Sequence, residues 1–132
     1  MLHRALVLVA EDEPFIACDL ALAIEDQGGE VAGPAASVKE ALSLIRERLV
    51  AGAILDANLT DGDVSPVVEI LAGSGIPVIV QTGVGLPQHL TRRFPDLIVH
   101  LKPCVAAALV AELAGLIADW RKRGVAVVGQ LD

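Results

Sequence analysis

The sequence predicts a single α/β domain in which a doubly wound parallel sheet carries helices on both faces. Short apolar runs alternate along the chain with segments in which apolar residues recur at helical spacing. Most of the runs are apolar throughout, which is typical of strands buried on both faces. The length of 132 residues fits one domain, and 54% of the residues are hydrophobic, so a large share of the chain is expected to be buried.

The first half of the chain contains two expected strands and two expected helices. Pro14 suits the first turn of a helix, and Gly28 and Gly29 end that helix. Ser37 and Glu40 have the spacing of a capping box at the start of the second helix. The expected elements are a strand over 4–10, a helix over 14–27, a short strand over 30–32 before the breaker at 33–34, and a helix over 38–52 whose apolar face includes Leu49.

The second half begins with the apolar run 53–55, which ends at Asp56 and is followed by turn-forming residues. Ser65 and Pro66 suit the start of the next helix. The expected elements are a strand over 53–55, a helix over 65–72, a strand over 77–81, a helix over 86–94, a strand over 96–101 and a helix over 105–123. An extra edge strand and a frayed end fit the segment 125–132 equally well. We therefore expect one domain over 1–124 and a C-terminal tail over 125–132.

Charge and composition argue against several classes of partner. The net charge of −7 disfavours nucleic acid, and the basic clusters 92–93 and 121–123 fall near expected helix ends, where cations complement the dipole. The longest apolar run, 104–111, is too short to span a membrane, and no signal peptide opens the chain. Cys18 and Cys104 lack metal-ligand spacing and are expected to be reduced. We expect a cytoplasmic protein with no nucleic-acid or membrane partner.

Polar residues follow the ends of four expected strands. Right-handed crossovers place all the carboxyl ends of parallel strands at one edge of the sheet, where ligands bind in such folds. This edge is expected to collect Glu11, Asp12 and Glu13 after the first strand, Asp56 after the third, Thr82 after the fourth and Lys102 after the fifth. Asp56, which follows the central strand, is the leading candidate for the reactive group.

These side chains suit a divalent cation and a phosphoryl group. Mg²⁺ prefers oxygen ligands and keeps several waters, so two carboxylates and one carbonyl, that of Asn58, suffice. The hydroxyl of Thr82 and the ammonium of Lys102 can hold phosphoryl oxygens. A carboxylate in these surroundings is a candidate nucleophile, and Asp56 would then form an aspartyl phosphate.

Four motifs in this order and spacing resemble the receiver domains of two-component response regulators. The motifs are LVAEDEP, AILDANLTDGD, VIVQTG and HLKP, and the resemblance extends over about residues 4–122. It implies a flavodoxin-like, doubly wound five-stranded parallel sheet of order 2-1-3-4-5 with helices on both faces. It also implies a signalling module that dephosphorylates itself, not a turnover enzyme.

The resemblance assigns a role to each candidate residue. The implied Mg²⁺ ligands are Glu11, Asp12 (the more direct of the acidic pair), Asp56 and the carbonyl of Asn58. The implied phosphoacceptor is Asp56, with Thr82 as the hydroxyl drawn to the phosphoryl group and Lys102 as its counter-charge. The Lys102–Pro103 bond is expected to be cis.

Three positions depart from the common pattern of this family. Thr60 stands where Pro is frequent, which is expected to loosen the loop after Asp56. Gly83 stands where a small Ala or Ser often follows the switch threonine. Val99 stands where many members carry a switch aromatic, so a signal that depends on an aromatic rotamer is not expected here.

No output domain is visible after Arg123, so we expect a stand-alone receiver. It would accept a phosphoryl group from a histidine kinase or phosphotransfer protein and signal through contacts with a downstream protein. One alternative is a degenerate receiver that binds partners independently of phosphorylation. Another is a haloacid-dehalogenase-type phosphohydrolase, because 56–60 partly resembles the nucleophile motif of that family, although Asn58 replaces its second Asp.

The last helix carries a wide apolar arc. Its expected sheet-facing residues are Val105, Leu109, Leu113, Leu116 and Trp120, and the arc is extended by Ala106, Val110 and Ile117. The apolar arc is wider than packing against a sheet requires, which indicates a partner or a homodimer through this helix. A helix that is simply well buried explains the pattern equally well.

Overall fold

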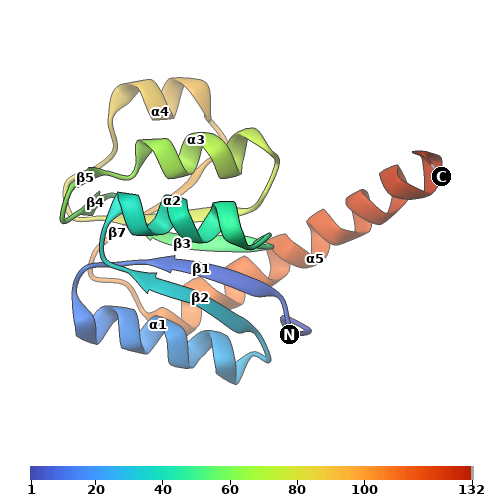
Figure 1. Cartoon of the computed structure of the whole chain (residues 1–132), viewed down its shortest axis with the longest axis horizontal. Helices are drawn as coiled ribbons and strands as arrows, with labels where there is room; N and C mark the ends of the chain where they lie inside the picture. The colour runs from blue at the N-terminus through green and yellow to red at the C-terminus, as the bar shows by residue number, and fades with distance from the viewer. Residues whose placement is uncertain (132) are drawn as a thin grey trace.

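Five parallel strands form the centre of the molecule in the order β2-β1-β3-β6-β7 (Figure 1). The computed structural model describes the backbone of residues 1–131 and the side chains of residues 1–123. The strands are β1 (Leu6–Ala10), β2 (Glu30–Ala35), β3 (Gly52–Asp56), β6 (Val78–Thr82) and β7 (Ile98–Leu101). With β6 and β7 counted as the fourth and fifth strands, this order confirms the predicted 2-1-3-4-5 sheet.

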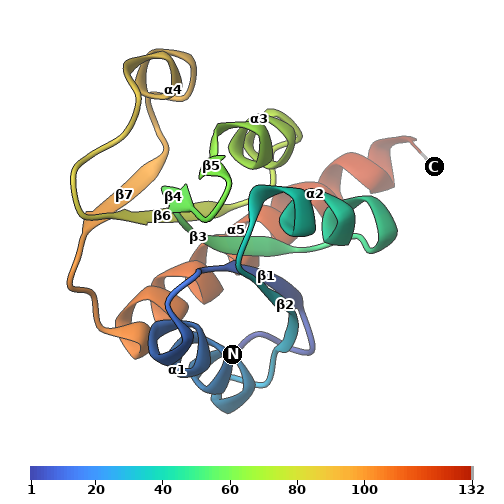
Figure 2. The ribbon, with the colours of Figure 1, turned by 60° about the vertical axis from the view of Figure 1, so that its left-hand side comes forward.

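Helices cover both faces of this sheet, as predicted (Figures 1 and 2). One face carries α1 (Pro14–Asp26) and α5 (Ala106–Leu131). The other carries α2 (Val38–Glu47), α3 (Ser65–Gly73) and the short α4 (Gln88–Arg93). No helix in the described part of the chain combines the length and apolar character that crossing a membrane requires.

Each face of the sheet has its own apolar core, because successive side chains of a strand point to opposite faces. Leu8, Leu55 and Val80 belong to the core under α2 and α3. Val9, Ile54 and Ile79 belong to the core under α1 and α5. The central strands are buried on both sides, which explains why their sequences are apolar throughout.

The predicted ends of the second strand and of the second helix were wrong. β2 continues through the Gly33–Pro34 pair to Ala35, which pairs with Ala10 of β1, and the Gly33–Pro34 bond is cis. α2 ends at Glu47 instead of continuing to residue 52, and Leu49 is 90% exposed instead of packing on the sheet. Pairing with β1 thus overrides the breaker at 33–34, and the reversal of the chain before β3 overrides the helical spacing of apolar residues after Glu47.

The loop after Asp56 forms a small hairpin that the sequence analysis did not predict. β4 (Asn58–Leu59) pairs in antiparallel fashion with β5 (Gly62–Asp63). Gly62 has a φ of 145°, a conformation that residues with a side chain rarely adopt. Of the predicted turn formers, Thr60 and Asp61 form the turn, whereas Asn58, Gly62 and Asp63 belong to β4 and β5.

The apolar arc of α5 is filled from within the domain. Its buried residues are Leu109, Val110, Leu113, Ala114 and Ile117, and α5 packs against both α1 and the sheet. This double packing accounts for the width of the arc, so the arc does not require a homodimer. Val105, predicted to face the sheet, is 70% exposed because it precedes the first helical residue. The backbone of α5 continues to Leu131, so residues 125–131 do not form an edge strand, and Asp132 lies outside the described residues.

Candidate functional site

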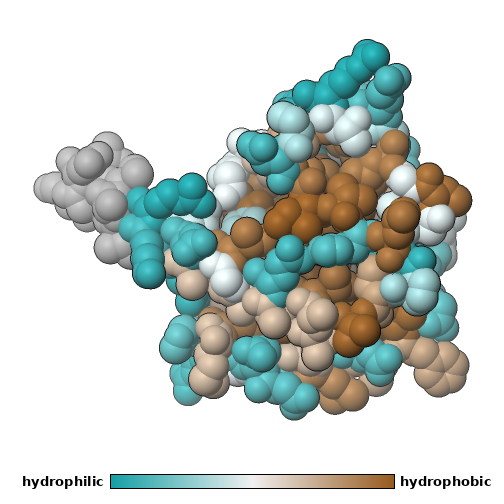
Figure 3. All heavy atoms as spheres, turned by 180° about the vertical axis from the view of Figure 1, so that it is seen from behind, coloured by the Kyte–Doolittle hydropathy of each residue, from teal (hydrophilic) through white to brown (hydrophobic). Residues whose placement is uncertain are grey.

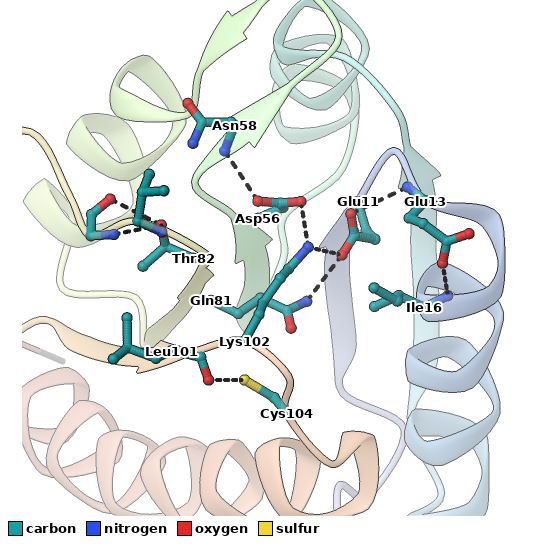
Figure 4. Close-up of polar contacts among 12 residues, drawn as sticks. Glu11, Glu13, Ile16, Asp56, Asn58, Gln81, Thr82, Leu101, Lys102 and Cys104 are labelled. Atoms are coloured by element: carbon teal, nitrogen blue, oxygen red, sulfur yellow. Dashed lines mark hydrogen bonds and ion pairs between the residues drawn. The ribbon is translucent and has the colours of Figure 1, made fainter.

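The carboxyl edge of the sheet brings Asp56, Glu11 and Lys102 into direct contact (Figure 4). Asp56 is the last residue of β3, Glu11 follows β1, and Lys102 follows β7. The Lys102 Nζ lies 2.8 Å from Asp56 Oδ2 and 2.9 Å from Glu11 Oε1. Because Glu11 and Asp56 are both buried, Lys102 neutralises charge that solvent cannot reach. The Lys102–Pro103 bond that follows is cis, as expected.

Glu11 is held by groups from three segments. Its Oε2 accepts the backbone N–H of Glu13 at 3.2 Å, and its Oε1 accepts Lys102 Nζ and, at 3.4 Å, the amide Nε2 of Gln81. Burial raises the pKa of Glu11 from its ordinary value of 4.5 to about 7, and the neighbouring Asp56 carboxylate adds to this rise. Lys102 opposes the rise. Glu11 is therefore a carboxyl that can take up a proton near neutral pH in the absence of a metal ion.

Lys102 keeps its positive charge despite partial burial. Burial lowers the pKa of its ammonium, but the hydrogen bonds with Asp56 and Glu11 outweigh that effect and raise the pKa above its ordinary value. A permanent cation beside a carboxylate can hold an anionic oxygen without any proton transfer. Lys102 is thus placed to contact an anionic group attached at Asp56.

Three carboxylates at this edge fit a hard divalent cation. Oxygen atoms of Glu11, Asp12 and Asp56 all lie within 4.8 Å of one another. In an octahedral Mg²⁺ site with metal–oxygen distances of about 2.1 Å, neighbouring oxygen ligands are about 3.0 Å apart and opposite ones about 4.2 Å, so the three carboxylates are near enough for one ion to contact them after the side chains adjust. Asp12 is exposed and would leave room for the waters that Mg²⁺ retains.

Asn58 contacts Asp56 through its backbone. Its N–H donates to Asp56 Oδ1 at 3.1 Å, which fixes the orientation of the carboxylate from the side opposite to Lys102 (Figure 4). The expected role of its carbonyl as a metal ligand stays a prediction.

The loop that begins at Asn58 is tied to the N-terminus of α2. The N–H and hydroxyl of Thr60 both donate to the carbonyl oxygen of Ala36, at 3.2 and 3.0 Å. Asp61 accepts the N–H groups of Val38 at 2.6 Å and Lys39 at 3.1 Å, and these bonds hold the pKa of Asp61 below its usual range. The expectation that Thr60 loosens this loop was therefore wrong, because its hydroxyl supplies an anchor that Pro does not have.

Thr82 is fully buried, and its hydroxyl is engaged with its own loop. The Oγ1 donates to the carbonyl of Gly85 at 2.9 Å and accepts the N–H groups of Val84 at 3.2 Å and Gly85 at 3.0 Å. Figure 4 shows this hydroxyl apart from the contacts between Asp56 and Lys102. To bond a group at Asp56, it must first exchange its bond with Gly85.

Gln81 is a site residue that the sequence analysis missed. It lies opposite Asp56 in the strand register, is 2% exposed, and donates to Glu11. The signal in the sequence is a polar residue inside the otherwise apolar run PVIVQ. The pattern predicts Gln81 only as the end of a strand, whereas its amide donates to a carboxylate that follows a different strand, β1.

The fold and this group of residues define a receiver-type signalling domain. No protein-family model and no curated protein sequence matches the chain. Among solved structures, the chain is similar to SdrG from Sphingomonas melonis Fr1, with 32% identity and a TM-score of 0.71 over 89% of this chain and 99% of SdrG. It is also similar to the response regulator PhyR from Brucella abortus, with 31% identity and a TM-score of 0.75 over 93% of this chain and 51% of PhyR. A CheY-like receiver domain protein from Methanospirillum hungatei shares the fold, with a TM-score of 0.79 at 20% identity over 90% of this chain and 98% of that protein.

The chain belongs to the response regulator receiver domain family. Receiver domains are signalling modules and not turnover enzymes. The chain spans only about half the length of PhyR, so the resemblance to PhyR concerns that part alone.

Proposed function

We propose that this domain accepts a phosphoryl group on Asp56 in a Mg²⁺-dependent reaction and passes the signal on through protein contacts. The observation that carries the proposal is the pairing of Asp56 with Lys102 at 2.8 Å beside the carboxylates of Glu11 and Asp12. A nucleophilic carboxylate, a fixed cation and a set of oxygen ligands are the parts that phosphoryl transfer needs. The donor would be a histidine kinase or a phosphotransfer protein.

In the proposed reaction an Asp56 oxygen attacks the phosphorus of a phosphohistidine. The phosphorus–nitrogen bond breaks, and the histidine nitrogen keeps the electron pair. The N–H of Asn58 holds the other carboxylate oxygen and thereby orients the attacking one. Lys102 then shifts from the carboxylate to a phosphoryl oxygen, where its charge offsets the developing negative charge. A bound Mg²⁺ would neutralise the remaining phosphoryl charge.

Thr82 supplies the proposed link between the acyl phosphate and the surface. Its hydroxyl would release the carbonyl of Gly85 and donate to a phosphoryl oxygen instead, since hydrogen bonds to anions are the stronger kind. That exchange would remove one of the three bonds between Thr82 Oγ1 and the loop 83–87. Val84 is 86% exposed in this loop, so the rearrangement would change an apolar surface that a partner can recognise.

Intact-mass spectrometry after incubation with acetyl phosphate tests the proposal. The wild type should gain one phosphoryl group with Mg²⁺ and none with EDTA, and Asp56→Asn should gain none while keeping its far-UV circular dichroism. Asp63→Asn is a matched control, because Asp63 lies in the same loop without contacting Lys102. Equal labelling of the wild type and Asp56→Asn would show that another residue is modified. No labelling of the wild type by acetyl phosphate or by a phosphorylated kinase would favour the alternative of a phosphorylation-independent binding module.

A further inference from the structure

A cavity of about 410 Å³ lies at the end of the sheet opposite to Asp56. It opens between the α3–β6 connection, the α4–β7 connection and α5. Its apolar wall includes Ile76, Leu97 and Leu116, none of which the receiver site uses. Figure 3, which views the molecule from the side of α5, shows a broad apolar surface bordered by hydrophilic side chains. The volume is within the range of small-molecule sites, about 300–1,000 Å³.

Two of the three aromatic residues of the chain meet in this cavity. Phe94 and Trp120 both line it, and both are half-buried, whereas Phe15 is 81% exposed. The fully buried core of the described residues is built from aliphatic side chains without any aromatic. The two rings are therefore gathered at a surface cavity and not in the core, which is a common property of ligand sites.

Both basic clusters of the sequence also contribute to this cavity. Arg93 and Arg123 line it, although they come from separate helices of a chain with a net charge of −7. The Arg93 guanidinium carbon lies 5.2 Å from the centroid of the Phe94 ring, which holds it against the cavity wall. Its ion pair with Glu69, at 3.8 Å, is long and exposed, so the guanidinium can accept another anionic partner. One acid, Asp96, lines the cavity together with these two cations.

We propose that this cavity binds a small carboxylate carried on an aromatic or short aliphatic body. The apolar body would lie against Phe94 and Trp120, and the carboxylate would pair with Arg93 and Arg123, since the planar guanidinium matches a carboxylate in shape and charge. The compact cavity suits a small molecule better than an extended peptide, which needs a longer groove. The site is separate from the proposed phosphoacceptor and would give the domain a second input.

Titration with 3-phenylpropionate tests this site, because Trp120 is the only tryptophan and the chain has no tyrosine. Its fluorescence should change in a saturable way, and 3-phenylpropionamide, which lacks the charge, should bind about three- to tenfold more weakly. Arg93→Gln and Arg123→Gln should each weaken binding of the carboxylate about threefold and leave binding of the amide unchanged. Arg92→Gln is the matched control and should bind as the wild type does, because Arg92 is exposed and does not line the cavity.

Four results would overturn the proposal. The first is the absence of both a fluorescence change and shifts in the amide resonances of Ile76 and Leu97 at millimolar ligand. The second is equal affinity for the acid and the amide. The third is that a tryptophan-free acidic peptide binds tightly at these residues whereas the small carboxylate does not bind. Ala72→Leu narrows the cavity from α3 without removing a charge, and unchanged affinity in that variant would also contradict the placement of the ligand.

Discussion

Replacing Glu11 by Gln should remove a pH dependence of stability that the wild type shows without divalent cations. The pKa of Glu11 rises from 4.5 to about 7 on folding, chiefly because of burial. Between these values the folded protein holds a proton that the unfolded chain has lost, so the free energy of unfolding falls as the pH rises. The stabilisation that this proton on Glu11 gives the folded state is complete below pH 4.5 and is lost by about pH 7. At about 1.36 kcal/mol per pKa unit, the rise in the pKa of Glu11 corresponds to a change of about 3 kcal/mol in the free energy of unfolding.

Urea unfolding in EDTA at several pH values between 5 and 8 measures this effect. The difference in unfolding free energy between the wild type and Glu11→Gln should fall by about 2–3 kcal/mol across the range. Glu30→Gln, a substitution at an exposed strand residue, should give a difference that stays nearly constant. If the wild type and Glu11→Gln have parallel profiles, Glu11 does not carry the raised pKa. With saturating Mg²⁺ the dependence should shrink, because the cation favours the ionised carboxylate.

Three further results are expected. Asp12→Ala should raise the Mg²⁺ concentration for half-maximal labelling of Asp56 about tenfold, because one of three carboxylates is lost, and an unchanged Mg²⁺ dependence would contradict the ligand set. Thr82→Ala should speed amide hydrogen exchange at residues 84–85 in the unphosphorylated protein, because the hydroxyl that accepts both N–H groups is gone, and equal exchange rates would contradict that anchor. Leu113→Ala should lower the free energy of unfolding by about 2–5 kcal/mol in urea titrations through a cavity under α5, and a change below about 1 kcal/mol would mean that the site collapses around the smaller side chain.

The sequence was sufficient to predict the sheet and its polar edge because both depend on local signals. A buried parallel strand is an unbroken apolar run, and the first polar residue after it marks the edge. Asp56 and Lys102 could be placed together in this way, although they are 46 residues apart. The contact of Lys102 with Glu11 follows from the same geometry.

The features that could not be predicted depend on partners distant in the sequence. The extension of β2 through Pro34 requires pairing with β1, and the hairpin after Asp56 requires Asp61 and Thr60 to meet the start of α2. The role of Gln81 becomes visible only when β6 lies near the end of β1, because its partner is Glu11. A pattern confined to one segment carries no information about such contacts.

The bonds from Asp61 to α2 make the first turn of that helix part of the reactive loop. The helix start and the loop share one carboxylate, so neither can move without changing the hydrogen bonds of the other. Under the proposed function, substitutions at exposed positions near Lys39 should therefore alter the rate at which Asp56 is labelled by acetyl phosphate. A partner protein that bound the start of α2 would, through the same bonds, be coupled to any ligand that binds the loop, and this coupling would act equally in both directions.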